Sequence, residues 1–167
     1  MRIQRTNHLS DTERHQLTGW GEDIFLSEAL NLLWRPKEEH LVLYVGDQPV
    51  SHCGLIRQNV QVGDFTLSIG GVGGVVTPPS YQGRGYASQI IKEALSIFTS
   101  ENHAAAILFC RTALVAFYQQ QGWTLLPDPV HVLQAQGSQA FPACTMVYTL
   151  NRRIWPAGTV NIDSPPW

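Results

Sequence analysis

The sequence predicts an α/β domain of the α+β kind, in which a mixed, mostly antiparallel central sheet is flanked by helices. Two observations predict this fold class. Residues 40–76 read as three successive strands separated by Gly-Asp turns, which is typical of an antiparallel meander. A proline-glycine corner and an amphipathic helical pattern follow over residues 77–98, and strands and a short helix alternate after them. No repeat or linker divides the chain, so we expect a single domain over 1–167.

Composition narrows the function classes. The chain has 167 residues, a formal net charge of −2 and a hydrophobic fraction of 44%, which suits a compact globular protein and gives no basic surface for nucleic acid. Its longest apolar run, residues 104–110, is too short to cross a bilayer, and the N-terminus lacks the apolar core of a signal peptide. Cys53, Cys110 and Cys144 are too far apart in sequence to indicate a zinc site. We therefore expect a cytoplasmic protein with no membrane, nucleic-acid or metal partner.

The first third of the chain predicts an edge strand followed by two helices. Residues 1–9 are expected to form the strand. Ser10 is a good N-cap, Glu13 completes a capping box, and the helix is expected to end by Gly19. A second helix is predicted over 23–34, where apolar residues recur at helical spacing. Three strands are then expected over 40–45, 50–60 and 65–76.

The second half predicts alternating strands and helices. A continuous apolar run at 104–110 favours a strand buried on both faces. Thr112 is expected to cap a helix over 113–121, which Gly122 would end. Strands are predicted at 123–126 and 145–150, a loop at 137–139, and an ordered or semi-ordered tail at 152–167.

The stretch from Gly70 to Leu95 predicts an anion site. The prolines at 78 and 79 end a strand, and a helix begins near Gly85. The first turn of a helix has unpaired amides and a positive dipole end, and the glycines at 83 and 85 let an anion approach. A P-loop would need a lysine that is absent between residues 70 and 91, and Ser88 stands where a dinucleotide fingerprint needs Gly or Ala. A phosphate or pyrophosphate ligand is nevertheless expected.

Two motifs resemble those of the GNAT superfamily of acetyl-coenzyme A-dependent N-acetyltransferases. Gln82-Gly83-Arg84-Gly85-Tyr86-Ala87 resembles the family's Gln/Arg-x-x-Gly-x-Gly/Ala signature. Phe117-Tyr118-Gln119-Gln120-Gln121-Gly122-Trp123 is similar to the Phe-Tyr-x-x-x-Gly-Phe/Trp segment that follows the next strand. The motifs stand in the family's order, and the resemblance covers roughly residues 39–150.

The resemblance implies acetyl-coenzyme A as donor, and it assigns roles to residues of both motifs. Amides near Val75, Val76 and Thr77 would hold the thioester and the pantetheine arm, which fills a gap between two splayed strands. Gly73 and Gly74 suit the local bulge that this gap needs. The pyrophosphate would lie on the amides of the corner, and Tyr118 would be the general acid. The implied cofactor-binding residues are Val75, Val76, Thr77, Gln82, Gly83, Arg84, Gly85, Tyr86, Ala87 and Ser88.

The sequence says less about the residues that would bind the acceptor substrate. Residues 49–55, 70–76 and 163–167 look similar to aminoglycoside 2′-N-acetyltransferases, in which a C-terminal tryptophan carboxylate reaches the substrate; Trp167 matches that residue. That family's acidic residue falls on Gly73 here, which weighs against a polycationic sugar. Glu22 and Asp23 could instead hold a cationic substrate or lie in a solvated loop. His52 is either a base or a structural histidine.

We therefore expect acetyl transfer to a primary amine, with a small molecule, possibly aminoglycoside-like, as the first choice of acceptor. Acetylation of a protein N-terminus or lysine is a second reading. A coenzyme A-binding sensor module without turnover is a third. A homodimer is left open.

Overall fold

The computed structural model describes all of residues 1–167, and it confirms the predicted fold class. The strands and helices are, in chain order, β1 (Arg2–Thr6), α1 (Asp11–Thr18), η1 (Glu28–Leu30), β2 (Glu39–Val45), β3 (Gln48–Val62), β4 (Phe65–Val76), η2 (Pro79–Tyr81), α2 (Tyr86–Ser100), β5 (Ala105–Cys110), η3 (Thr112–Leu114), α3 (Val115–Gln119), β6 (Thr124–Leu125), β7 (His131–Gln134), β8 (Gly137–Ala140), β9 (Cys144–Thr149) and β10 (Val160–Ile162). The η elements are short 3-10 turns.

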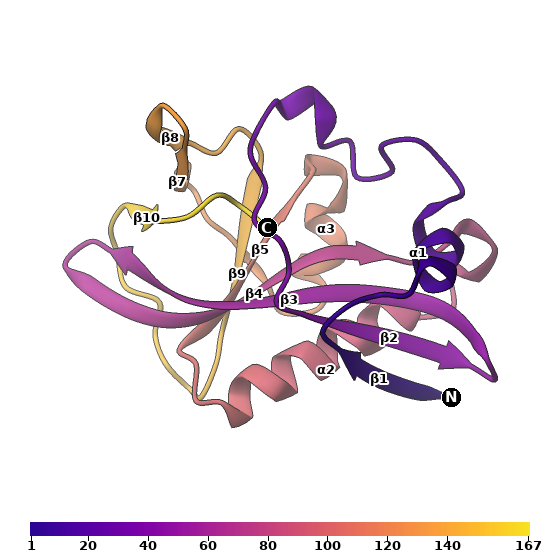
Figure 1. Ribbon diagram of the computed structural model, residues 1–167. Helices are drawn as coiled ribbons and strands as arrows, with labels where there is room; N and C mark the ends of the chain where they lie inside the picture. The colour runs from indigo at the N-terminus through magenta and orange to yellow at the C-terminus, as the bar shows by residue number, and fades with distance from the viewer.

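One curled sheet contains all ten strands (Figure 1). The main path runs β6-β9-β5-β4-β3-β10-β7-β8, and β2 pairs with β3 and then with β1. Only β4 with β5 and β10 with β7 are parallel, so the sheet is mostly antiparallel, as predicted. The parallel β4–β5 pair is joined by α2, the helix that follows the proline-glycine corner.

Helices cover both faces of the sheet, and alternate residues along a strand pack into the cores on its two faces. On β2, Leu41 and Leu43 belong to the core beneath α2, whereas Val42 and Tyr44 pack with Leu17 of α1. On β5, Leu108 faces the α2 core and Ile107 faces the opposite core. This alternation follows from the two-residue period of a strand, and Figure 1 shows α1 and α2 on opposite sides.

The predicted starts of both long helices are confirmed. Ser10 accepts a hydrogen bond from the Glu13 amide, and the Glu13 carboxylate accepts one from the Ser10 amide at 2.7 Å, which completes the capping box of α1. Gly85, at φ +78°, is the N-cap of α2. No helix in the structure combines the length and the apolar character that a membrane crossing requires.

The helix predicted over 23–34 is wrong. Only the single turn Glu28–Leu30 forms, and Asp23, Leu26 and Asn31 have left-handed φ values that a helix cannot contain. The Asp23 carboxylate accepts hydrogen bonds from the amides of Ser27 and Glu28, which holds a local turn in place of a helix. Several apolar residues of this segment line a cavity in place of forming a helix face: Ile24, Phe25, Leu26, Leu30 and Trp34.

One expectation for the C-terminal half also needs correction. The loop predicted at 137–139 lies in strand β8, which pairs with β7 as a hairpin. The tail contains strand β10, which pairs with β3 and β7, and its last residue, Trp167, is only 3% exposed. The tail is therefore an ordered part of the fold.

The helix predicted over 113–121 is divided into the turn η3 and the short helix α3. Thr112 does not cap it, because its hydroxyl contacts the Cys144 sulfur at 3.7 Å instead. Gly122, at φ +89°, marks the stop as predicted.

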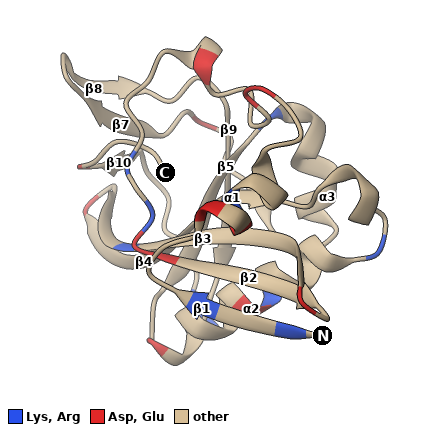
Figure 2. Cartoon of the chain, turned by 45° about the vertical axis from the view of Figure 1, so that its right-hand side comes forward, with Lys and Arg blue, Asp and Glu red and all other residues tan.

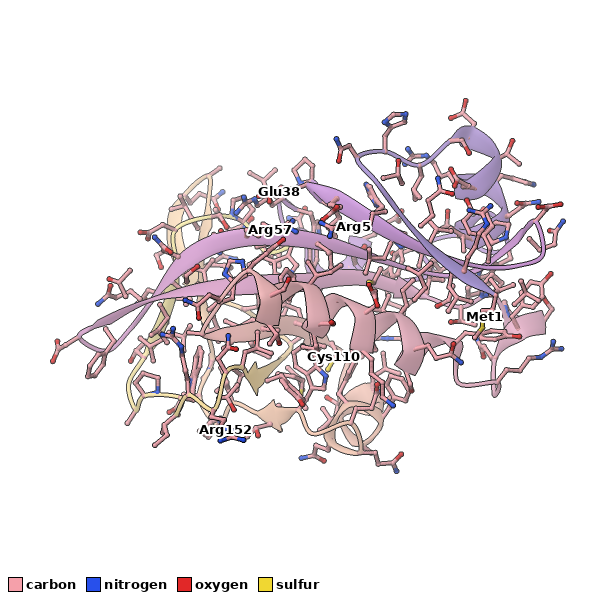
Figure 3. The ribbon with its side chains drawn as sticks, turned by 90° about the horizontal axis from the view of Figure 1, so that it is seen from below. Met1, Arg5, Glu38, Arg57, Cys110 and Arg152 are labelled. Atoms are coloured by element: carbon pink, nitrogen blue, oxygen red, sulfur yellow. The ribbon has the colours of Figure 1, made fainter.

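A network of ion pairs ties β1 and β2 to β3 and the end of α2. The Arg57 guanidinium donates to Glu39 at 2.9 Å and to Glu101 at 2.7 Å, and Arg5 donates to Glu39 at 2.8 Å. Figure 3 shows Arg5 and Arg57 close together over the sheet. These contacts raise the pKa of Arg57 and lower the pKa of Glu39 and Glu101, although burial acts against both carboxylates.

Candidate active site

A cavity opens where β4 and β5 separate. The two strands pair as far as Val72 and Leu108, and beyond that register each continues without the other. The resulting cavity has a volume of about 600 Å³, which suits a small-molecule ligand. Gly73 to Thr77 of the β4 side, Leu108 to Arg111 of the β5 side and the irregular segment 20–37 line it. The splayed pair that the resemblance implied is therefore present in the geometry.

The bulge expected at Gly73 and Gly74 is also present. His52 pairs with Val76 and Gly54 pairs with Gly73, so β4 has one residue more than β3 over this stretch. Gly74 has φ +58°, a conformation that residues with a side chain rarely adopt. The bulge turns the β4 edge toward the cavity just before Val75.

His52, on the neighbouring strand β3, contacts this bulge. Its Nδ1 lies 2.8 Å from the Gly74 carbonyl oxygen, and its Nε2 lies 2.9 Å from Nδ1 of His40. Because a carbonyl only accepts, His52 Nδ1 is the donor, and the neutral ring then accepts a hydrogen bond from His40. Burial is the largest cause that lowers the His52 pKa, to about 4. His52 does not line the cavity and both of its nitrogens are engaged, so the structure places it as a positioning residue.

A second cavity, of about 490 Å³, lies at the N-terminus of α2. None of the backbone amides from Gly83 to Ser88 donates a hydrogen bond to a backbone carbonyl in a turn or cap. Gly83 (φ +74°) and Gly85 are so open that an added Cβ would meet no atom within 4 Å. Unpaired amides at the positive end of a 15-residue helix could hold an anion such as a diphosphate.

The expected cofactor-binding residues divide between the two cavities. Those that line the second cavity are Val75, Thr77, Gln82, Gly83, Gly85, Tyr86, Ala87 and Ser88. Val76 lines only the first cavity. The Arg84 side chain lines neither: its guanidinium donates to the Ser80 carbonyl at 3.2 Å and lies over the Tyr81 ring. Arg84 would therefore contribute its amide.

Tyr118 lines both cavities, as do Val75, Thr77, Gln82 and Leu114. It lies on α3, is 5% exposed and packs edge-on against Phe117 and Trp123, the two other aromatic residues of the second motif. Burial raises the pKa of Tyr118, and the thiols of Cys110 and Cys53 act in the same direction. The phenol is thus kept protonated and able to donate.

Sequence reasoning missed Lys37, which lines the larger cavity. The Lys37 stem lies over two glycines. A Cβ added to Gly54 would lie 2.3 Å from Lys37 Cγ, and a Cβ added to Gly73 would lie 2.8 Å from Lys37 Cε. Lys37 forms no ion pair, and burial lowers its pKa. The segment Arg35-Pro36-Lys37-Glu38-Glu39 reads as a solvated charged turn, so no sequence signal pointed to this burial.

Trp167, near the other end of the chain, also lies beside Gly73. Figures 1 and 2 show the C-terminus beside the segment that leads into β2, and the Arg35 amide donates to the Pro166 carbonyl at 2.7 Å. A Cβ on Gly73 would lie 2.9 Å from the carbonyl oxygen of Trp167. The missing side chain at Gly73 therefore makes room for both Lys37 and Trp167.

The structure does not bring the two acidic candidates into the cavity. Glu22 is exposed and does not line it, and the Asp23 carboxylate is occupied by the turn at Ser27. No group of three or more His, Cys, Asp or Glu side chains is placed to hold a metal ion.

Comparison with known proteins agrees with this geometry. The family model for the acetyltransferase (GNAT) domain matches residues 12–126, well over half of the chain. The chain therefore belongs to the GNAT acetyltransferase family and is an acyltransferase. No curated protein sequence matches it significantly.

Solved structures share the fold at low sequence identity. An acetyltransferase from Bacillus subtilis in complex with CoA is 14% identical with a TM-score of 0.61, over 89% of this chain and 98% of that one. A GNAT family acetyltransferase from Brucella melitensis in complex with acetyl-CoA is 14% identical with a TM-score of 0.55, over 97% and 96%. An aminoglycoside 6′-N-acetyltransferase complexed with coenzyme A is 15% identical with a TM-score of 0.61, over 93% and 100%.

Proposed function

We propose that the protein transfers an acetyl group from acetyl-coenzyme A to the primary amine of a small molecule, with Tyr118 as general acid. The observation that carries the proposal is the continuity of the two cavities. One is built around free amides at a helix N-terminus, the other opens between splayed strands, and Tyr118 lines both. A donor with a diphosphate at one end and a thioester at the other fits this arrangement.

On the donor side, the diphosphate would rest on the amides from Gly83 to Ala87. The pantetheine arm would lie along the β4 edge between Val75 and Thr77, where β5 leaves that edge unpaired. An extended chain of amides can add to a free strand edge through main-chain hydrogen bonds. Acetyl-coenzyme A supplies the activated acyl thioester.

The reaction would be a direct transfer. The neutral amine attacks the thioester carbonyl carbon, the carbon–nitrogen bond forms and the carbon–sulfur bond breaks. Tyr118 gives its proton to the departing thiolate, the amine proton passes to solvent, and the Tyr118 phenolate takes a proton back from solvent. A positioned proton donor of this kind contributes roughly two to four orders of magnitude in rate. The thiols of Cys53 and Cys110 are poor nucleophiles here, because burial raises the pKa of both, that of Cys110 to about 11.

On the acceptor side, the ordered tail supports a small molecule in place of a protein. Trp167 and residues of the segment 20–37 line the larger cavity together with β4 and β5. A protein acceptor would need an open groove there. The Trp167 carbonyl group lies beside Gly73 and would face the acceptor amine.

Thiol release from acetyl-coenzyme A, measured with a panel of amines, tests this function. We expect release that depends on the amine and is lost in Tyr118→Phe. A protein that bound coenzyme A with unchanged affinity yet gave no release with any amine would instead be a sensor module.

A further inference from the structure

The larger cavity has a lining that does not suit a polycation. No Asp or Glu side chain is among its residues, whereas two cationic side chains, Lys37 and Arg111, are. The acidic residues nearest along the chain are unavailable: Glu22 is exposed outside the cavity, and Asp23 caps the turn at Ser27. A sugar that carries several ammonium groups would lose its hydration here and gain no counter-ion from these side chains.

The same cavity has an aromatic wall. Trp34 meets Phe141 edge-on at a centroid distance of 6.2 Å, Phe141 meets Phe109 at 4.4 Å, and Phe109 meets Trp167 at 4.9 Å. All four rings line the cavity, and Trp20, Phe25 and Tyr118 complete its aromatic residues. Such a wall favours a flat apolar group, which would gain from both area burial and ring packing.

Lys37 supplies a half-buried cation beside this wall. Its stem lies over the two glycines at positions 54 and 73, and no Asp or Glu side chain pairs with it. A charge withdrawn from water is normally paired, so an anionic group of the ligand would complete this site. Gly73 precedes Val75 by two residues across the bulge, so the two lie at most about 7 Å apart. A carboxylate on Lys37 and an amine at the thioester must therefore be close together in one molecule.

We propose that the acceptor is an apolar α-amino acid, aromatic ones best, whose side chain packs on the wall of Trp34, Phe109, Phe141 and Trp167 and whose carboxylate pairs with Lys37. This assignment rests on the proposed N-acetyltransferase function. It also accounts for the lack of a carboxylate base in the cavity. The apolar wall disfavours an ammonium, so the acceptor loses its proton readily on binding.

The test compares three acceptors with acetyl-coenzyme A as donor: phenylalanine, phenethylamine (the same molecule without its carboxylate) and kanamycin, an aminoglycoside. We expect phenylalanine to give the highest kcat/KM. In Lys37→Met, kcat/KM for phenylalanine should fall about 10- to 100-fold, the worth of a buried charge-assisted hydrogen bond, while that for phenethylamine should change little. Lys92, the only other lysine, is exposed on α2, and Lys92→Met is the matched control.

The other outcomes overturn the assignment. A higher kcat/KM for kanamycin or phenethylamine than for phenylalanine would contradict it. An equal fall in kcat/KM for phenylalanine and phenethylamine in Lys37→Met would also contradict it. A gain of one acetyl mass on Lys37 would show that this lysine is itself an acceptor, which also contradicts the proposal. If coenzyme A binds but phenylalanine gives no thiol release, the acceptor class is wrong. If coenzyme A does not bind, the proposed function itself fails.

Discussion

The imidazole of His52 donates a hydrogen bond of 2.8 Å to the carbonyl oxygen of Gly74, the left-handed residue of the β4 bulge. A buried neutral ring thus holds the backbone at the point where β4 separates from β5. The orientation of the cavity edge depends on this contact, although His52 does not itself line the cavity.

Acid should destabilise the protein through His52. Its folded-state pKa of about 4 lies below the unfolded value of about 6.5, so the unfolded state binds the proton more tightly between these limits. The stabilisation is fully present above pH 6.5 and is lost as the pH falls toward 4. Between pH 7 and pH 5 the loss should be about 2 kcal/mol.

Urea unfolding at the two pH values measures this effect. His52→Gln keeps an amide donor for Gly74 but does not titrate, so its stability should fall less over the same interval. His8→Gln, at an exposed histidine, is the control. An identical acid sensitivity in wild type and His52→Gln would contradict the role given to His52.

Tyr118→Phe should lower kcat by roughly two to four orders of magnitude and leave coenzyme A affinity almost unchanged. The substitution removes only a hydroxyl and keeps the ring packed against Phe117 and Trp123. Because burial raises the pKa of Tyr118, wild-type turnover should not decline between pH 7 and pH 9 on account of this group. Steady-state kinetics and calorimetric titration report the two effects separately, and an unaltered kcat would remove Tyr118 from the mechanism.

Gly83→Ala should weaken coenzyme A binding, because a methyl group would then stand among the free amides. The substitution also costs about 1–2 kcal/mol of stability, since residue 83 has φ +74°. Gly46→Ala is a matched control: Gly46 has φ +60° in the β2–β3 turn and, like Gly83, would place its Cβ in open space. Both variants should lose similar stability, and only Gly83→Ala should lose affinity in a titration. Equal affinities would argue against an anion site at this corner.

Trp167→Ala should destabilise the fold by about 3–5 kcal/mol, the usual cost of removing a buried large aromatic side chain. The ring is 3% exposed and packs on Phe109 at 4.9 Å. Thermal unfolding measures the loss, and Ile154→Ala, at a 91% exposed position of the same C-terminal segment, is the control. A melting temperature unaffected by Trp167→Ala would mean that the tail does not pack in solution.

The elements that the sequence predicted correctly are those in which one physical signal dominates. The turns at Gly46 and Gly63, the capping box at Ser10 and the apolar stripe of α2 depend on neighbouring residues, so local sequence contains the information. The bulge at Gly74 was expected from the family resemblance, and the adjacent glycines at 73 and 74 were compatible with it.

The errors lie where distant parts of the chain decide the conformation. Residues 23–34 are apolar because they line a cavity formed with β4 and β5, and nothing local distinguishes that from a helix face. Strand β8 has the polar sequence of a loop and is defined by its pairing with β7. The burial of Lys37 depends on glycines 17 and 36 residues away, at positions 54 and 73, and on the approach of Trp167.

A crystal structure of the protein with coenzyme A would show whether one donor molecule occupies both cavities. We expect the diphosphate oxygens on the amides from Gly83 to Ala87, the pantetheine arm along Val75 to Thr77, and the thiol directed toward Tyr118. A diphosphate bound away from the N-terminus of α2, or an arm that lies outside the gap between β4 and β5, would contradict this expectation.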